Sequence, residues 1–380
     1  MRSLYIHIPF CRSRCKYCDF LSYVPSGDDV ISGYVNALIR EMSLYRGVKI
    51  DTIYIGGGTP SILTPKQFGF IVNALYTVFD VKPGAEFTIE ANPESLDSEK
   101  VRTWKAFGVS RVSLGIQSLN DSVLEYWGRI TRSEDSIRAV YILSSEQIRN
   151  VNIDLILGLQ AVIGKTKGVE LYKTDLARAA AFRPAHISVY MLYLQGKETS
   201  GTFGRRIRLF DDKTYEQLYY HTVDFLLSCG FDHYEISNFA KTGFASLHNM
   251  NYWKGGAYIG LGPGAVSTEK GRREKNTEDL GKYIEALKKG KRPVSDTEIL
   301  GEREVLCERI MLSLRTSGGI PISELKRRIN KKSNPAFDNY LNELQNLGYA
   351  ETKSDRLRLT PAGFFRSNYI ISSLLRFFDQ

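Results

Sequence analysis

Residues 11–18 read Cys11-Arg12-Ser13-Arg14-Cys15-Lys16-Tyr17-Cys18, a C-x3-C-x2-C arrangement close to the start of the chain. Three thiolates at this spacing can hold three corners of a cubic iron-sulfur cluster and leave one iron without a protein ligand. Clusters that only carry electrons are held by four cysteines. Cys11, Cys15 and Cys18 therefore predict a 4Fe-4S cluster whose open iron binds a substrate or cofactor. The alternative is a Cys3His zinc site completed by His7.

The composition is that of a globular protein in a reducing compartment. The 380 residues are 43% hydrophobic, enough for a large core and more than one domain. Cys229 and Cys307 are isolated, so the cysteines do not form a disulfide framework. No apolar run is long enough to span a membrane and no signal peptide precedes the first strand, so we expect a cytoplasmic protein. The net charge of +9 suits nucleic acid, anionic lipid or a porphyrin with propionates, and does not choose among them.

The first half of the chain alternates short β-branched runs with longer amphipathic stretches. The runs are apolar throughout, as in parallel strands buried on both faces, and lie at residues 4–8, 52–55, 86–90, 111–115, 152–157 and 186–192. Helices are expected near residues 28–46, 65–80, 97–107, 133–146 and 168–182. The pattern predicts an α/β fold, a parallel (βα)6 partial barrel whose chemistry lies at the C-terminal ends of the strands.

We expect three consecutive segments: a barrel over residues 1–195, an extension over 196–297 and a C-terminal cap over 298–380. The cap shows helix candidates at residues 306–314, 322–329 and 337–347 and a β-ribbon candidate at 351–359, a pattern similar to a winged helix. Its basic residues raise the alternative of nucleic-acid binding, and they are Arg327, Arg328, Lys331 and Lys332. Because no recognition helix rich in Arg, Asn and Gln stands out, we expect no specific nucleic acid.

Small and polar residues follow the predicted strands where a barrel enzyme has its site. Residues 56–60 read Gly-Gly-Gly-Thr-Pro, and glycine lets the backbone approach a ligand closely. Glu90 ends the third strand, Gln117 follows the fourth, Arg129 lies further on, and Asp154 lies in the fifth. At a barrel mouth these side chains would offer hydrogen-bond acceptors and charge to a bound ligand.

The cysteine motif resembles that of the radical S-adenosylmethionine (SAM) enzymes. Nearly the whole chain resembles one branch of them, the oxygen-independent coproporphyrinogen III oxidases and the related haem chaperones of the HemW type. The resemblance is carried by residues 5–11, 56–61, 90–93, 115–118, 152–155 and 233–238. It implies that SAM chelates the open iron and that Tyr17 packs on the adenine. It also implies SAM pockets lined by Tyr5, Gly57, Gly58, Thr59, Glu90, Gln117, Arg129 and Asp154.

Two features favour the chaperone over the oxidase. Oxidases of this group resemble C-x3-C-x2-C-x-C after a long leading segment, whereas here Phe20 takes the place of the fourth cysteine. Residues 248–253, His-Asn-Met-Asn-Tyr-Trp, resemble the H-N-x-x-Y-W signature of the chaperones. His248 is therefore a candidate haem ligand, with Tyr252 and Trp253 as stacking surface. The alternative is a histidine hydrogen-bonded to backbone, with the aromatic residues in the core.

The resemblance implies a protein that binds haem, the 4Fe-4S cluster and SAM, and passes haem to an acceptor protein that can be membrane-associated. It also implies an electron donor such as flavodoxin or ferredoxin. This interpretation assigns no catalytic residue. The alternative is the oxidase reaction of porphyrin biosynthesis, in which a SAM-derived radical leads to decarboxylation of porphyrinogen propionates. The chain departs from the family pattern at three places: Thr131 stands where the histidine of Gly-Arg-x-His is common, residues 160–163 replace an expected Pro-Gly turn, and Val266 stands where a histidine often follows Gly-Ala. These departures concern the second ligand pocket.

Overall fold

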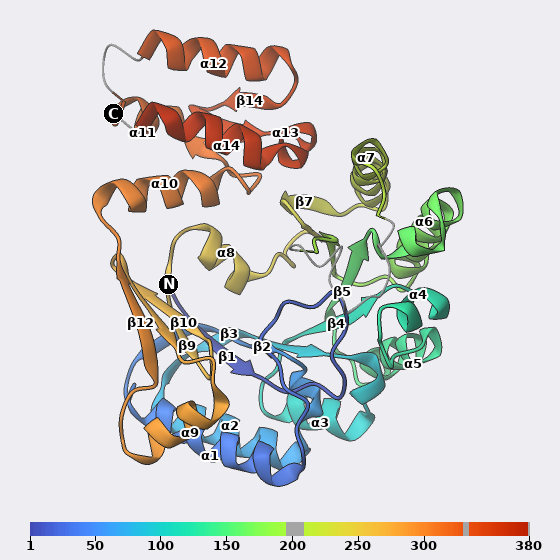
Figure 1. The fold of residues 1–380 in the computed structure, drawn as a ribbon, viewed down its shortest axis with the longest axis vertical. Helices are drawn as coiled ribbons and strands as arrows, with labels where there is room; N and C mark the ends of the chain where they lie inside the picture. The colour runs from blue at the N-terminus through green and yellow to red at the C-terminus, as the bar shows by residue number, and fades with distance from the viewer. Residues whose placement is uncertain (195–208, 330–333, 379–380) are drawn as a thin grey trace. The chain divides into compact units, whose positions relative to one another are not determined.

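A computed structural model describes residues 1–194, 209–329 and 334–378 of the chain (Figure 1). The chain forms two compact units, each made of two stretches of sequence. Unit 1 comprises Met1–Asp211 and Ala257–Glu298, and unit 2 comprises Asp212–Gly256 and Ile299–Gln380. The expected boundary at residue 195 lies outside the described residues, and the one at residue 297 lies beside the end of unit 1 at Glu298. The sequence did not anticipate that residues 212–256 group with the C-terminal residues.

The predicted parallel barrel strands are present in unit 1. Six strands pair in chain order and all six run parallel, which confirms the predicted βα arrangement. They are β1 (Arg2–Ile8), β2 (Lys49–Gly57), β3 (Asp80–Ala91), β4 (Arg111–Gln117), β5 (Asn150–Leu157) and β6 (His186–Met191). Their C-terminal ends meet at one edge, so the residues that follow them come together there.

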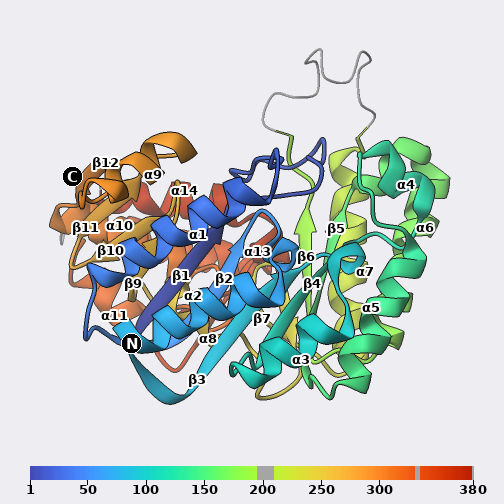
Figure 2. The same ribbon diagram turned by 90° about the horizontal axis from the view of Figure 1, so that it is seen from below.

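Helices cover the outer side of this sheet (Figure 2). They are α1 (Asp28–Ser43), α2 (Pro65–Val78), α3 (Ser98–Ala106), α4 (Asp121–Tyr126), α5 (Ser133–Ser145) and α6 (Lys165–Ala181). Polar residues fix several starts: Thr64 and Gln67 form a capping box on α2, and the Asp97 carboxylate accepts from the Lys100 amide at 2.8 Å on α3. Phe68 and Trp104 pack in the apolar layer between helices and sheet.

A late stretch of the chain widens the sheet of unit 1 beyond β1. The added elements are β9 (Ala257–Leu261), β10 (Val266–Glu269), β11 (Arg272–Asn276), α9 (Leu280–Lys288) and β12 (Val294–Ile299). β9 runs parallel to β1, and β10 is antiparallel to both β9 and β11. We call residues 257–298 the strand extension. Its place beside β1 was not predicted.

Unit 2 contains the helix pair and ribbon expected of the C-terminal cap. The elements from its second stretch are α10 (Glu302–Ser313), β13 (Ile320–Pro321), α11 (Ile322–Lys326), α12 (Asn334–Asn346), β14 (Ala350–Lys353), β15 (Arg356–Leu359), α13 (Pro361–Phe365) and α14 (Ser367–Leu375). β14 and β15 form the predicted ribbon, and the sheet order is β13-β15-β14. Ser354 and Asp355 both have positive φ, as the tight turn of such a ribbon requires.

The first stretch of unit 2 supplies α7 (Asp212–Ser228), β7 (Asp232–Glu235), β8 (Asn238–Ala240) and α8 (Leu247–Trp253). It joins the C-terminal residues through backbone and side-chain contacts. The Ile236 amide donates to the Arg315 carbonyl at 2.9 Å, and Arg366 pairs with Glu216 at 2.7 Å. These long-range contacts explain why unit 2 is discontinuous in sequence. In the described part of the chain, no helix combines the length and apolar character that crossing a membrane requires.

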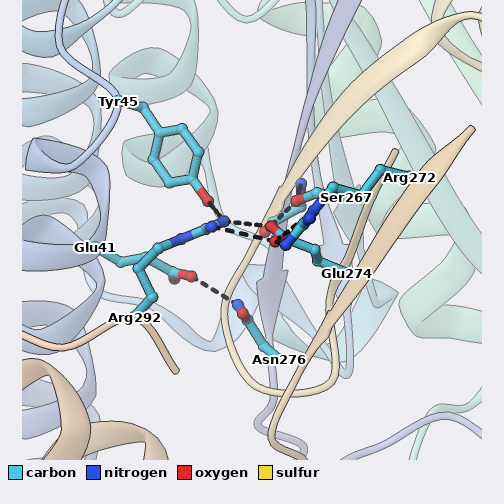
Figure 3. A network of polar contacts seen from close by, with 8 residues as sticks. Glu41, Tyr45, Ser267, Arg272, Glu274, Asn276 and Arg292 are labelled. Carbon is cyan, nitrogen blue, oxygen red and sulfur yellow. Dashed lines mark hydrogen bonds and ion pairs between the residues drawn. The ribbon is translucent and has the colours of Figure 1, made fainter. Parts of the chain in front are cut away.

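A buried carboxylate fastens the strand extension to α1 (Figure 3). Glu41 is 1% exposed and accepts from the Gly262 amide at 2.8 Å, from Asn276 Nδ2 at 2.6 Å and from the Tyr283 hydroxyl at 2.6 Å. Nearby, Arg292 pairs with Glu274 at 2.6 Å. Burial raises the pKa of Glu41 to about 7, since the three hydrogen bonds only partly offset the loss of water.

This raised pKa makes the stability of unit 1 depend on pH. The folded protein keeps a proton on Glu41 that the unfolded chain, with an ordinary carboxyl pKa of 4.5, has already lost. The contribution is present below the unfolded pKa and is lost as the pH rises through the folded value. Glu41→Gln cannot titrate. We expect wild type to lose on the order of 3 kcal/mol relative to this variant between about pH 4.5 and about pH 7.

Urea unfolding of both proteins across this pH range measures the difference. Glu99→Gln, at an exposed position of α3, is the control and should follow the wild-type profile. A constant gap between wild type and Glu41→Gln at all pH values would contradict the account of Glu41.

Candidate functional site

The three motif cysteines lie in the segment between β1 and α1, residues 9–27, which we call the cysteine loop. The Tyr23 amide donates to the Pro9 carbonyl at 2.7 Å and the Cys11 amide to the Tyr23 carbonyl at 3.0 Å, so the two arms of the loop close on each other. Between them the Cys18 amide donates to the Cys15 carbonyl at 3.2 Å. All three cysteines are in the thiol form, outside any disulfide, and are partly exposed. The loop thus presents three thiols from one short, cross-braced segment.

The glycine turn after β2 is hydrogen-bonded directly to the start of this loop. The Gly58 amide donates to the Ile8 carbonyl at 2.8 Å, and the Thr59 amide to the Phe10 carbonyl at 2.7 Å. A Cβ on Gly58 would lie 2.7 Å from the Phe10 carbonyl oxygen and 3.0 Å from Cys11 Sγ. Gly57 has φ +117°, and a Cβ there would lie 2.7 Å from His7 Nδ1. Side chains at either position would push the cysteine loop away.

Hydrogen bonds and burial determine whether the thiols of the cysteine loop are protonated. Thr59 Oγ1 donates to Cys11 Sγ at 3.3 Å. Burial nevertheless raises the pKa of Cys11, and it also raises the pKa of Cys18. Without a metal these two thiols therefore hold their protons at neutral pH, and binding iron requires their release.

His7, the proposed fourth ligand of the zinc alternative, is engaged on both ring nitrogens. Nε2 lies 2.9 Å from the Leu21 carbonyl and Nδ1 lies 3.0 Å from the Tyr5 hydroxyl. Because a carbonyl only accepts, Nε2 carries the proton and Tyr5 donates to Nδ1. Among the described residues, no three His, Cys, Asp or Glu side chains come close enough together to hold a single metal ion. His7 thus links β1 to the cysteine loop through its hydrogen bond to the Leu21 carbonyl, and the Tyr5 hydroxyl is hydrogen-bonded to His7 Nδ1.

Glu90 and Asp154 lie on the inner face of the sheet near this loop. Glu90 accepts from the Tyr54 hydroxyl at 2.7 Å and from the Gly57 amide at 3.1 Å, which ties it to the glycine turn. Asp154 accepts from Ser113 at 2.9 Å and from Asn152 Nδ2 at 2.8 Å. Burial raises the pKa of Glu90 to about 7 and also raises the pKa of Asp154. Burial thus favours the protonated form of both carboxyls.

Arg129 connects the cysteine loop to the end of β4. Its guanidinium donates to the Gly115 carbonyl at 2.7 Å and to the Tyr17 hydroxyl at 3.2 Å. Tyr17 packs edge-on against Trp127, with ring centroids 5.9 Å apart. Gln117 ends β4 with φ +68°, a conformation that costs energy outside glycine. A pocket next to Cys15 is lined by Arg12, Ser13, Cys15, Asn92, Glu94, Arg129, Ile130 and Thr131.

The haem candidates lie in unit 2, on α8. His248 is 1% exposed, and its Nε2 lies 2.9 Å from the Tyr252 hydroxyl, one helical turn away. Their rings meet edge to face at 4.9 Å. Trp253 is partly exposed at the end of the same helix. The structure thus brings His248 and Tyr252 together as a side-chain pair.

Sequence reasoning missed four residues that shape the site. Tyr54 bonds Glu90, Asn92 Nδ2 donates to Thr59 Oγ1 at 3.1 Å, and Glu94 accepts from Thr131. Lys100 is buried and donates to the carbonyls of Ser61 and Ser95, both at 2.8 Å, which joins the turns after β2 and β3. Asn92 and Glu94 follow Glu90 directly after a strand, so their positions were a usable signal. Lys100 lies in a helix with no such signal.

Comparison with known proteins agrees with this geometry. Residues 5–161 match the profile of the Radical SAM superfamily, and residues 300–366 match that of the HemN C-terminal domain. The fold is similar to the solved structure of coproporphyrinogen III oxidase (HemN) from Escherichia coli, with a TM-score of 0.82 and 22% identity over 98% of this chain and 89% of that one. The chain therefore has the radical SAM fold.

Curated relatives show which family of the superfamily the chain belongs to. The heme chaperone HemW of Lactococcus lactis is 32% identical over 98% of this chain and 97% of its own length. HemW of Bacillus subtilis is 31% identical over 99% of both chains. The chain belongs to the HemW family within the radical SAM superfamily.

Proposed function

We propose that this protein is a haem chaperone that binds a 4Fe-4S cluster, SAM and haem, and transfers haem to an acceptor protein. The observation that carries the proposal is the cysteine loop of a HemW family member, which presents three cysteine thiols and is hydrogen-bonded through its backbone to the glycine turn. The donor set fits the cluster, because three thiols lie in one loop and the absent Cβ of Gly58 leaves room against Cys11 Sγ. When bound, the cluster would supply an open iron for SAM to chelate.

The chain's own residues hold SAM at the inner face of the sheet. Gly57 and Gly58 let the glycine turn approach His7 and Cys11 closely, and Thr59 Oγ1 donates to Cys11 Sγ. Glu90 and Asp154 accept hydrogen bonds, while Arg129 offers positive charge near Cys15. In this proposal SAM pockets are lined by Tyr5, Tyr17, Gly57, Gly58, Thr59, Glu90, Gln117, Arg129 and Asp154.

Haem binding is proposed for unit 2. His248 offers its Nε2 to iron once the Tyr252 hydroxyl moves aside, and Tyr252 and Trp253 offer ring faces. His233 is the second candidate. Its ring stacks on Phe239 at 4.3 Å, its Nε2 is buried without a hydrogen-bond partner among the described residues, and burial lowers its pKa to about 4, so its imidazole is neutral.

The remaining partners follow from the same proposal. They are an acceptor protein for haem and an electron donor such as flavodoxin or ferredoxin. In this proposal the protein acts in the cytoplasm. Among the basic residues that suggested nucleic-acid binding, Arg328 lies 4.0 Å from Glu302, and Lys331 and Lys332 fall outside the described residues.

The second candidate function is oxidation of coproporphyrinogen. The fold shared with HemN favours this second function. Phe20 speaks against it, because a 69% exposed phenylalanine stands at the position of the oxidase's fourth cysteine.

Cys11→Ala should abolish the brown chromophore and most of the iron after anaerobic reconstitution, because two thiolates cannot hold the cluster's three protein-bound corners. Iron, sulfide and the visible spectrum are measured. Cys229→Ala and Cys307→Ala are matched controls outside the loop and should keep wild-type iron. Full iron in Cys11→Ala, or its loss in the controls alone, would refute the assignment.

At pH 8, above its pKa of about 7, Glu90 is mostly ionised, and Glu90→Gln should then weaken SAM binding about tenfold or more because it removes a charged acceptor while preserving shape. Equilibrium dialysis with labelled SAM measures affinity on protein of equal iron content. Glu99→Gln serves as the exposed control. Unchanged SAM affinity in Glu90→Gln would remove Glu90 from the pocket.

His248→Ala should shift the Soret band and weaken haem binding about tenfold or more, since iron loses an axial ligand. Haem titrations are run with and without SAM, and His233→Ala is titrated in parallel. A change in His233→Ala alone would move the ligand to His233. Wild-type protein that binds no micromolar haem yet converts coproporphyrinogen anaerobically would contradict the chaperone and support the oxidase.

A further inference from the structure

The strand extension meets the cysteine loop at the end of β1. β9 pairs with β1 up to Leu261 opposite Ile6, so the turn at residues 262–264 lies beside His7. Gly262 has φ +102°, and a Cβ there would lie 2.6 Å from the His7 carbonyl oxygen. That same oxygen accepts from the Tyr34 hydroxyl at 2.5 Å. The turn therefore packs directly on the backbone four residues before Cys11.

The same turn also contacts the far arm of the cysteine loop. Gly264 has φ +69°, and a Cβ there would lie 2.8 Å from Leu21 Cδ2. Leu21 is the residue whose carbonyl pairs with His7 Nε2. Two residues later, the Tyr23 hydroxyl donates to the Glu278 carbonyl, just past β11. The extension thus contacts the end of β1 before Cys11 and the arm of the cysteine loop that follows Cys18.

Buried hydrogen bonds fix the turn itself. Glu41 accepts from the Gly262 amide, and Asn276 Nδ2 bridges the Glu41 carboxylate at 2.6 Å and the Gly262 carbonyl at 3.0 Å. The Gly264 amide donates to the Thr277 carbonyl at 3.0 Å. Figure 3 shows Glu41 and Asn276 in this arrangement. Because α1, β11 and the turn are joined in this way, the turn is a rigid support for the loop.

We propose that the strand extension is the outer wall of the cluster site, with Gly264 and Tyr23 acting as positioning residues that hold the cysteine loop in the geometry the cluster needs. The inference rests on the proposed cluster at Cys11, Cys15 and Cys18. It makes residues more than two hundred positions away in sequence part of the machinery that retains the cluster and shields it. Tyr23 also contacts Cys11 directly, because its carbonyl accepts from the Cys11 amide at 3.0 Å, whereas Gly264 acts through Leu21.

The test compares two glycine variants with the same backbone demand. Gly264 has φ +69°, and the Cβ of Gly264→Ala would contact Leu21. Gly290 has φ +68°, and the Cβ of Gly290→Ala would have no atom within 4 Å. Both lie in the extension, so both bear the strain of a left-handed alanine. Only Gly264→Ala should lower the iron content after reconstitution, alter the EPR spectrum of the reduced cluster and speed its bleaching in air. Tyr23→Phe, which loses the hydrogen bond to Glu278, should bleach about fivefold faster.

Each outcome decides the matter. If Gly264→Ala and Tyr23→Phe keep wild-type iron, EPR spectrum and bleaching rate, the positioning role is overturned. If Gly290→Ala loses the cluster equally, the effect is backbone strain and the role is again overturned. Should Gly264→Ala fail to fold by circular dichroism, Tyr23→Phe alone decides. Failure of the proposed function is seen separately, as wild-type protein that retains no more iron than Cys11→Ala.

Discussion

The backbone hydrogen bonds from the glycine turn to the segment before Cys11 are the constraint on which the site depends. They continue the β1–β2 pairing past the end of the strands, through Gly58 to Ile8 and Thr59 to Phe10. The approach is so close that neither Gly57 nor Gly58 can carry a Cβ without a clash. The thiols are therefore positioned by the sheet, and a short loop of partly exposed residues gains the rigidity of the strands it follows.

The inner face of the sheet differs from the packed apolar interior of a closed barrel. Register places Thr88, Arg111 and Asn150 side by side on β3, β4 and β5, one layer below Glu90 and two layers below Asp154. Each of the three has a buried polar atom without a hydrogen-bond partner among the described residues, and Arg111 is 2% exposed. Leaving such atoms unpaired is costly, so the inner face is suited to water and ligand and not to close packing.

Much of the fold could be predicted because its signals are local. The apolar runs of the six parallel strands, the capped helices between them and the cysteine spacing all lie within short windows of sequence. The strand extension could not be predicted, since β9 resembles any short strand until it is paired with β1. Glu41 likewise reads as one more acidic residue of an amphipathic helix. Its burial follows from Gly262, Asn276 and Tyr283, which meet it only in the folded chain.

The departures from the family pattern have local physical explanations in unit 1. Thr131 is buried, donates to Glu94 and lies 3.3 Å from the Arg129 guanidinium, so it keeps arginine and carboxylate joined without an imidazole. Gln160, in the stretch that replaces a Pro-Gly turn, donates to the buried Asp175 at 2.9 Å. A hydroxyl and an amide do not ionise near neutral pH, whereas a histidine does. The substitution at Thr131 therefore removes a titratable group from the neighbourhood of Arg129 while the hydrogen bonds that hold the arginine in place are preserved.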